Sequence, residues 1–351
     1  MTGSAELEHA RMAAVTDFDY HLPASAIAQT PASPRDASRL LDTRDGSDHR
    51  FGELASLLVP GDLVVVNQTR VRAARLHGVK RETGGAVEAL LLRRIDPDRW
   101  EALVRPARRL RAGSLVDFGA IQACLLSDPV DGIATLSLEA AGDIEEAVER
   151  HGEVPLPPYI DAVLDDPGRY QTIFATRPGS AAAPTAGLHF TPGVVDSLVD
   201  AGIEMAAVDL EVGLATFRPI ATESIEDHVM HSEVFEVSEA TAAAVASCRG
   251  RGGRVIAVGT TTVRVLETQK EPGGLIRPGR GETSLYLRPG SRFGVVDGLV
   301  TNFHLPRSSL VVLIAAFMGP GWREAYHSAL SRGYRFLSFG DAMYCERGGV
   351  T

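Results

Sequence analysis

The segment 225–233, with the sequence IEDHVMHSE, places two histidines three residues apart among carboxylates. Histidine gains and loses a proton near neutral pH, so His228 and His231 are candidates for general acid and base, with Asp227 beside them to tune that exchange. A His-x-x-His pair near a carboxylate also suits zinc, but the spacing matches no established zinc signature such as HExxH. A solvated polar loop is the third interpretation. We predict that the segment, including Glu233, acts in catalysis or substrate binding.

A second group of reactive side chains lies in the loop 184–192, with the sequence PTAGLHFTP. Two prolines and a glycine restrict this loop just before a helix begins, so it presents Thr185, His189 and Thr191 with little conformational freedom. The free N–H groups of a helix N-terminus attract anions. We interpret the loop as part of a substrate site, with an ordinary capped surface loop as the alternative.

Two more polar segments each follow an apolar, strand-like run. Segment 254–264 (RVIAVGTTTVR) passes through Gly259 into a threonine-rich helix start, and segment 300–306 (VTNFHLP) turns polar where its strand ends. The first lacks GxGxxG and GxxxxGKS, which disfavours a dinucleotide or a P-loop nucleotide; threonines that merely cap a helix are the alternative. Because the recurrence favours one site at the strand ends, we expect several polar side chains to meet there. They are Thr260, Thr261, Arg264, Thr301, Asn302 and His304.

Helices and strands alternate in the part of the chain that carries these segments. A helix is predicted after Thr191, with Pro192 at its first position and Gly202 at its end. The elements predicted after it are a strand at 203–210, a helix at 240–248, a strand at 254–258, a helix at 261–269, a strand at 295–301 and a helix from Ser308. This order indicates a mainly parallel sheet or a barrel.

The stretch 70–111 differs from the rest in charge and pattern. It holds eleven Arg and one Lys against five acids, a balance of 12 − 5 = +7, so the remainder of this chain of net charge −10 carries −17. Short β-prone runs punctuated by Gly, Pro or Asp predict a compact antiparallel all-β module. The runs are 71–79, 86–92, 100–104, 114–118, 121–126 and 133–138.

Length and composition exclude several protein classes. The 351 residues suggest two domains, and 44% hydrophobic and 23% charged residues are typical of a globular protein. The three cysteines are odd in number and form no CxxC pair, which argues against a disulfide framework or a thiolate zinc site. The longest apolar run, 310–318, is too short to cross a bilayer, and no charged-then-apolar leader opens the chain, so we expect a cytoplasmic protein without membrane contact.

Several motifs together resemble one family. They include FDYHLP (18–23), RDASRLL (35–41), NQTRV (67–71), VPLPPYI (154–160), PTAGLHFT (184–191), IEDHVMHSE (225–233), AVGTTTVRVLET (257–268) and TNFHLP (301–306). In this order, from about residue 18 to 343, they resemble the S-adenosylmethionine:tRNA ribosyltransferase-isomerase family of queuosine biosynthesis. The resemblance implies an α/β-barrel-like main domain with a smaller inserted all-β domain. We predict a catalytic domain from 17–68 and 152–351 and a basic β domain at 69–151. Residues 1–16 show no clear pattern, so we predict a mobile extension there.

The resemblance implies transfer and isomerisation of the ribosyl part of S-adenosylmethionine onto 7-aminomethyl-7-deazaguanine at the tRNA wobble position. Epoxyqueuosine-tRNA would form, and adenine and methionine would leave; S-adenosylmethionine is then a substrate, and no cofactor or metal is expected. A base would take the 5′ proton beside the sulfonium, and an acid would assist adenine. The catalytic candidates in the matching motifs are His189, Asp227, His228 and His231. The substrate-binding candidates are Thr185, Thr191, Glu211, Arg218, Glu233, Thr260, Thr261, Arg264, Asn302 and His304, with Thr260, Thr261 and Arg264 assigned to the methionine carboxylate or the ribose.

The expected partner is a tRNA that carries the aminomethyl-deazaguanine base, bound by a protein that we expect to be a monomer. A net-acidic protein must meet phosphates with a local basic face, and a solvated β surface is the alternative. The candidates for that face are Arg70, Arg72, Arg75, Arg105, Arg108, Arg109 and Arg111.

Two alternatives stay open, one suggested by departures from the family pattern and one by the number of histidines. Where relatives carry His and Gly, this chain has Glu211 and Ala215. A diverged or catalytically silent tRNA-binding relative is one alternative. A metal-dependent hydrolase is the other, built on His189, His228, His231 and His304.

Overall fold

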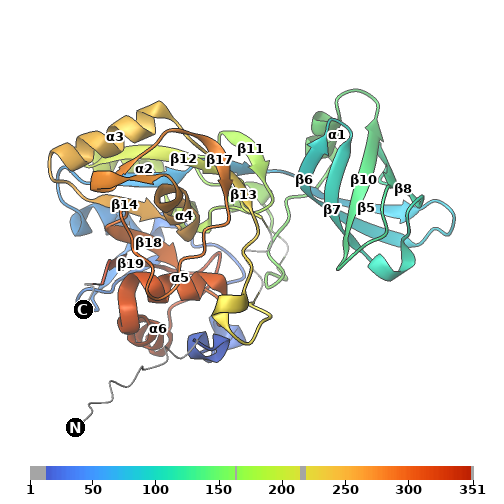
Figure 1. Cartoon of the computed structure of the whole chain (residues 1–351). Helices are drawn as coiled ribbons and strands as arrows, with labels where there is room; N and C mark the ends of the chain where they lie inside the picture. The colour runs from blue at the N-terminus through green and yellow to red at the C-terminus, as the bar shows by residue number, and fades with distance from the viewer. Residues whose placement is uncertain (1–12, 163, 214–218, 349–351) are drawn as a thin grey trace, which may run out of the picture.

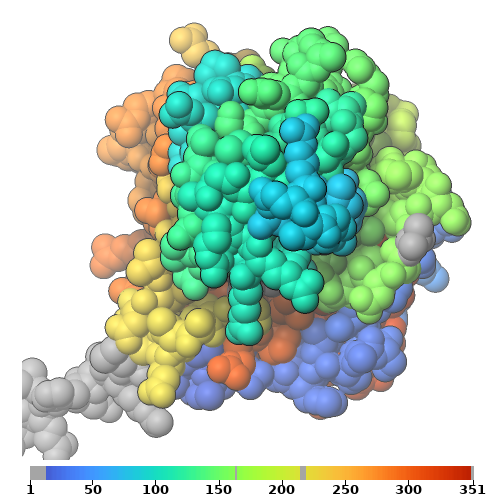
Figure 2. Space-filling view, turned by 90° about the vertical axis from the view of Figure 1, so that its right-hand side faces the viewer, coloured from blue at the N-terminus to red at the C-terminus, as the bar shows by residue number. Residues whose placement is uncertain are grey.

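The computed structural model describes residues 13–162, 164–213 and 219–348. It consists of a larger body, built on a sheet covered by helices, and a smaller barrel that stands to one side (Figure 1). Figure 2 faces the barrel and shows the rest of the chain behind and below it.

The larger body is built on a nine-stranded sheet with the order β17-β13-β12-β3-β14-β18-β19-β1-β2. The strands are β1 (Arg39–Asp42), β2 (Asp48–Arg50), β3 (Leu63–Asn67), β12 (Glu204–Leu210), β13 (Glu233–Val237), β14 (Val255–Val258), β17 (Gly279–Thr283), β18 (Gly298–Asn302) and β19 (Ala342–Glu346). Strands β12, β3, β14 and β18 run parallel to one another, whereas β19 is antiparallel to β18. Every residue of β3, β14 and β18 is buried, as expected for strands covered on both faces.

Two hydrophobic cores lie on opposite faces of this sheet. In β3, Leu63 and Val65 belong to one core, and Val64 and Val66 belong to the other, because successive side chains of a strand point to opposite faces. The first core includes α3 (Glu239–Gly250), α4 (Thr260–Thr268), α5 (Ser309–Met318) and α6 (Trp322–Ser331). The second includes α2 (Pro192–Asp200) and the 3-10 helix η4 (Phe51–Leu57).

The larger body is thus a mixed α/β structure, and its strand order has two ends, β17 and β2. In the part of the chain that the structure describes, these strands do not close into the barrel-like arrangement that the sequence predicted. In the described residues β2 pairs only with β1 and β17 only with β13, so the sheet keeps two edges, whereas a barrel closes by pairing its first strand with its last.

The smaller body is a closed antiparallel barrel with the order β10-β7-β6-β5-β8-β9. Its strands are β5 (Arg75–Lys80), β6 (Ala86–Asp96), β7 (Arg99–Arg105), β8 (Leu115–Asp117), β9 (Ile121–Leu125) and β10 (Ile133–Ala140). Alternate residues of β7 are buried around Trp100, which is the pattern of a strand with one face in a core. The antiparallel all-β module is confirmed, and the helix α1 (Ile144–His151) packs on its core.

Two predictions for the chain near the barrel and the N-terminus need correction. The run 71–79 is two strands: β4 (Thr69–Val71) pairs with β11 (Arg177–Ser180) outside the barrel, and β5 begins the barrel. At the N-terminus, Val15 is 1% exposed in the main core, and its N–H donates to the carbonyl of Glu223. The predicted mobile extension 1–16 therefore does not reach residue 16; its residues 1–12 lie outside the described part of the chain.

We expect Gly78→Ala to destabilise the barrel. A methyl group on Gly78 would lie 2.2 Å from the backbone oxygen of Asp117 and 2.5 Å from the ring of Phe118, so β5 and β8 would have to separate. The expected loss is about 2 kcal/mol or more of unfolding free energy, as for other overpacked sites. Urea unfolding followed by Trp100 fluorescence in a Trp322→Phe background measures it. The control is Gly85→Ala, whose methyl group would be 3.4 Å from its nearest neighbour; an equal effect of both changes would contradict this account.

Candidate active site

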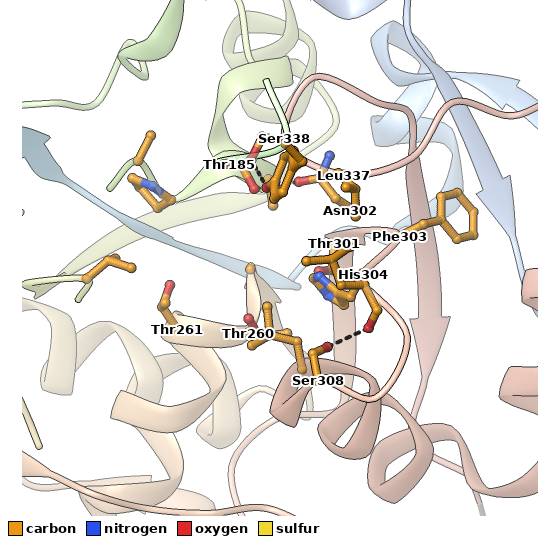
Figure 3. Close-up of a pocket in the computed structure, with 18 residues that line it drawn as sticks. Thr185, Thr260, Thr261, Thr301, Asn302, Phe303, His304, Ser308, Leu337 and Ser338 are labelled. Carbon is orange, nitrogen blue, oxygen red and sulfur yellow. Dashed lines mark hydrogen bonds between the residues drawn. The ribbon is translucent and has the colours of Figure 1, made fainter. Parts of the chain in front are cut away.

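A cavity opens where β14 and β18 end and where α4 and α5 begin (Figure 3). The 3-10 helix η7 (Thr185–His189) and residues Leu337 and Ser338 complete its wall. Because β14 and β18 are adjacent parallel strands, segments more than 30 residues apart in the sequence meet at one sheet edge. The predicted site residues that line the cavity are Thr185, Thr260, Thr261, Asn302 and His304. We call this space the strand-end cavity.

The residues that line the strand-end cavity include no Asp, Glu, Lys or Arg within the described chain. Burial lowers the pKa of His304 to about 3, and its Nε2 lies 3.0 Å from the Thr301 hydroxyl. Burial raises the pKa of Tyr159 to about 12, although the Ser338 hydroxyl, 2.7 Å away, opposes that rise. At neutral pH the lining is therefore uncharged, and neither of these two side chains titrates near pH 7.

The side-chain amide of Asn302 is held in one orientation. Its Nδ2 lies 3.3 Å from the backbone oxygen of Asp341, and only the amide nitrogen can donate to a carbonyl. The same nitrogen lies 3.0 Å from Nε2 of His189, so it donates to that ring nitrogen. Oδ1 of Asn302 accepts from the Thr185 hydroxyl at 2.9 Å. Since the Thr185 proton is committed to Asn302, the Thr185 oxygen offers the cavity only lone pairs.

His189 lies behind Asn302, outside the cavity lining. Its Nε2 accepts from Asn302, so in the neutral ring the proton is on Nδ1, which donates to the Ser38 hydroxyl at 2.7 Å. The ring stacks on Phe51 with centroids 4.8 Å apart. Burial lowers the pKa of His189 to about 4, an effect that Asp341 partly opposes. The geometry gives His189 the position of a neutral side chain that orients Asn302, where the sequence suggested a proton-exchanging group.

Helix α4 begins at the strand-end cavity without a side-chain cap. Its N-cap is Gly259, whose φ of 86° is the left-handed conformation that glycine adopts most readily. Thr260 and Thr261 follow and line the cavity, and both are buried. Thr262 instead donates its hydroxyl proton to the carbonyl of Val258 at 2.7 Å.

Arg264 and Glu233 form a buried ion pair away from the strand-end cavity. The Arg264 guanidinium also donates to the backbone oxygens of Leu285 (3.1 Å) and Thr283 (3.2 Å). Glu233 accepts from the N–H of Gly213 at 2.9 Å. The sequence suggested that Arg264 holds the methionine carboxylate or the ribose. Because its guanidinium is engaged in this way, Arg264 is not placed to hold the carboxylate.

His228 and His231 line a second cavity, together with Glu233, Arg264 and Ser309. This histidine cavity adjoins the strand-end cavity at the start of α5, where Ser308 lines one space and Ser309 the other. Burial lowers the pKa of His228, and the neighbouring His231 lowers it further. The His228 ring also contacts Tyr286, with centroids 5.3 Å apart.

The remaining polar candidates lie elsewhere. Asp227 is exposed on the short helix η9 (Ile225–Asp227). Thr191 caps α2, accepting from the N–H of Val194 at 3.3 Å and donating to Asp36 at 2.8 Å. Arg218 and Ala215 lie outside the described residues.

Glu211 lines a third cavity beside β12 and β13, among the charged side chains Arg177, Asp209, Glu236 and Arg280. Burial raises the pKa of Glu211, and Arg72 opposes that rise. A direct role in the predicted substrate site would require Glu211 to line the strand-end cavity. Glu211 is not among the residues that line it.

The histidines do not form a metal centre in the described residues. His304 lines the strand-end cavity and His189 lies behind it, whereas His228 and His231 line the histidine cavity. No group of three or more His, Cys, Asp or Glu side chains in residues 13–162, 164–213 and 219–348 is arranged to hold a metal ion. The metal-dependent hydrolase therefore lacks the cluster on which that alternative depended.

The seven candidate arginines fall into two sets. Arg70 pairs with Glu149, Arg72 with Glu145 at 4.0 Å and Arg75 with Glu88 at 3.5 Å, which neutralises much of their charge. The second set is exposed and, within the described chain, forms no ion pair with a carboxylate. It consists of Arg105, Arg108, Arg109 and Arg111, which we call the arginine edge of the barrel.

Sequence reasoning missed four polar groups around the strand-end cavity. Ser38 and Asp341 fix His189 and Asn302, and Tyr159 and Ser338 form part of the cavity wall. Ser38 and Tyr159 lie in the motifs RDASRLL and VPLPPYI, which carried the resemblance but gave no chemical signal of their own. Ser338 and Asp341 lie in no motif that we singled out.

In the described residues, no helix is both long enough and apolar enough to span a membrane.

Comparisons with known proteins agree over almost the whole chain. A family model described as "Queuosine biosynthesis protein" matches residues 15–345. The S-adenosylmethionine:tRNA ribosyltransferase-isomerase of Pelotomaculum thermopropionicum is 51% identical over 339 residues, which cover 94% of this chain and 98% of that protein. The enzyme of the same name from Moorella thermoacetica is 50% identical over 337 residues, with the same coverage. A crystal structure of S-adenosylmethionine tRNA ribosyltransferase from Thermotoga maritima, 36% identical, aligns with a TM-score of 0.52 and covers 93% of this chain and 99% of that one.

We expect the buried histidines to make the protein less stable in acid. The pKa of His189 in the folded chain is about 4, below its ordinary 6.5, so the unfolded chain takes up the proton first as the pH falls. The contribution of the neutral His189 ring to the free energy of unfolding is complete above about pH 6.5. It is lost as the pH falls toward 4, an effect of roughly 3 kcal/mol. His189→Asn should flatten the fall in unfolding free energy between pH 7 and 4.5, leaving the part due to His304. Urea titrations measure this slope. The exposed His327→Asn is the control, and an unchanged slope in His189→Asn would contradict the assignment.

Proposed function

This chain belongs to the queuosine biosynthesis family of S-adenosylmethionine:tRNA ribosyltransferase-isomerases, and from that membership we propose that it moves the ribosyl part of S-adenosylmethionine onto tRNA. The acceptor is the aminomethyl group of 7-aminomethyl-7-deazaguanine at the wobble position. The products are epoxyqueuosine-tRNA, adenine and methionine. S-adenosylmethionine is consumed as a substrate, and the proposal invokes no other cofactor and no metal.

One structural observation supports this proposal most. The motifs PTAGLHFT, AVGTTTVRVLET and TNFHLP, which carried the resemblance, line one cavity at the ends of adjacent strands. A partly open, uncharged space with several hydroxyl groups suits a nucleoside, whose ribose and base need hydrogen bonds to neutral partners. We therefore propose the strand-end cavity as the seat of S-adenosylmethionine.

The reaction needs a base and an acid, and the histidine cavity supplies candidates for both. The sulfonium acidifies the neighbouring 5′ carbon, so a neutral imidazole can take its proton. The pKa of His228 is below its ordinary value, which keeps this ring neutral and able to accept a proton at pH 7. We assign the base to His228, with His231 beside it as the group that exchanges a proton with the leaving adenine. Asp227, exposed on η9, receives no role in the proton transfer.

The tRNA would bind through the arginine edge of the barrel. Its four guanidinium groups are exposed and have no carboxylate partner in the described residues, so they can meet phosphates without first breaking an ion pair. Arg70, Arg72 and Arg75 are paired and contribute less. A tRNA substrate also fits the expected cytoplasmic location, and we propose that the enzyme acts as a monomer.

The direct test is adenine release from S-adenosylmethionine by the purified protein, with and without tRNA that carries the aminomethyl-deazaguanine base. We expect release that requires this tRNA and continues in the presence of a chelator. His228→Gln should lower turnover at least about 100-fold, the scale of general base catalysis, with little change in unfolding free energy. His327→Gln, on the surface of α6, is the control. Binding of tRNA without adenine release would instead indicate the silent relative.

The second test concerns the arginine edge. Reversing the charge of Arg105, Arg108 and Arg109 together should weaken tRNA binding at least tenfold and lower its dependence on log salt by about 2 to 3, because three phosphate contacts are lost. The matched control reverses Arg93, Arg99 and Arg150, which are also exposed but are paired with Glu101, Asp96 and Glu146. Equal effects of the two triple variants would show that the arginine edge has no special part in binding.

A further inference from the structure

The N-terminus of α4 opens into the strand-end cavity with its N–H groups free of any side-chain cap. The first N–H groups of an α-helix have no partner within the helix. In α4 the N-cap is Gly259, which has no side chain to accept from them. Thr260 and Thr261, the first two residues of α4, line the cavity.

The hydroxyl of Thr261 is a second and independent sign of a ligand at this point. The residue is 6% exposed, and in the described chain its Oγ1 is buried without a hydrogen-bond partner. A buried hydroxyl that lacks a partner is costly and uncommon in folded proteins. Figure 3 shows Thr261 at the start of α4 with its hydroxyl directed into the space below Thr185. A bound group with an acceptor atom would satisfy it.

Other sources of positive potential near this cavity are already engaged. The N-terminus of α5 is capped by Ser308, whose hydroxyl accepts from the N–H of Val311 at 3.3 Å and donates to the carbonyl of Leu305 at 2.7 Å. Arg264 is paired with Glu233. The lining itself carries no charged side chain in the described residues. An anionic group that enters the cavity is therefore matched by the start of α4.

We propose that the N-terminus of α4, with the Thr261 hydroxyl as a further donor, is a carboxylate seat that holds the methionine carboxylate of S-adenosylmethionine. This inference rests on the proposed function. A carboxylate has acceptor atoms only, so it can take hydrogen bonds from the free N–H groups and from Thr261 at once. Of the three residues expected to hold the methionine carboxylate or the ribose, it keeps Thr260 and Thr261 and drops Arg264, which is paired with Glu233.

The test compares binding of S-adenosylmethionine with that of its decarboxylated form, measured by calorimetry without tRNA. The wild-type protein should bind the decarboxylated compound at least tenfold more weakly. Thr261→Val, which keeps the shape and removes the hydroxyl, should weaken S-adenosylmethionine about tenfold and leave the decarboxylated compound within about twofold. Thr261→Ser should restore most of the affinity. Thr135→Val, on β10 of the barrel, is the control for a Thr-to-Val change far from the cavity.

Equal wild-type affinity for the two compounds would overturn the seat, and so would a Thr261→Val variant that weakens both alike. The wild-type comparison also decides the matter if Thr261→Val does not fold. The proposed function can fail separately from the carboxylate seat. A protein that binds S-adenosylmethionine more tightly than its decarboxylated form, yet releases no adenine with the modified tRNA, would support the seat and contradict the proposed reaction. A protein that releases adenine equally well from both compounds would support the proposed reaction and contradict the carboxylate seat.

Discussion

The hydrogen bond from Asn302 to the backbone oxygen of Asp341 determines how the strand-end cavity presents its polar groups. It fixes which end of the amide faces which neighbour, and through the amide it fixes the proton of His189 and the proton of Thr185. The Asp341 carboxylate is itself held, because it accepts from the N–H groups of Arg39 (3.0 Å) and Arg335 (2.8 Å). Three chain segments distant in sequence thus meet at one amide, whose NH₂ group and carbonyl oxygen each have a protein partner before any substrate arrives.

The sheet explains why these segments meet. Strands β3, β14 and β18 are buried on both faces, so their polar residues are confined to the strand ends. The ends of β14 and β18 continue into a helix or a turn whose first residues line the cavity, and helices α4 and α5 both begin there. The two cavities therefore differ in character. The strand-end cavity is uncharged and suited to holding a nucleoside, whereas His228 and His231 line the neighbouring histidine cavity.

Local sequence signals were sufficient for most elements and insufficient for the partners of side chains. The capped start of α2, the strand at β14 and the short strands of the barrel follow from propensity, turn residues and alternation. The open order of the large sheet depends on pairings between distant strands, which no local pattern reveals. The recurrence of polar residues after strands led us to expect Thr260, Thr261, Arg264, Thr301, Asn302 and His304 in one place, and all of them except Arg264 line the strand-end cavity. The pairing of Arg264 with Glu233 and the burial of His189 depend on tertiary packing, which the sequence does not reveal. For this reason the sequence suggested substrate binding by Arg264 and proton exchange by His189, and the geometry supports neither role.

The protonation of His189 tests this account most directly, because it reports the orientation of the Asn302 amide, on which the lone pairs offered by Thr185 also depend. Nitrogen-15 NMR of histidine-labelled protein, with His189→Asn to assign the signal, distinguishes the two ring nitrogens. We expect a neutral ring at pH 7, with the proton on Nδ1 and none on Nε2, unchanged down to about pH 5. A protonated Nε2 at pH 7, in either the neutral or the charged ring, would contradict the account, because Asn302 would then have no acceptor in His189.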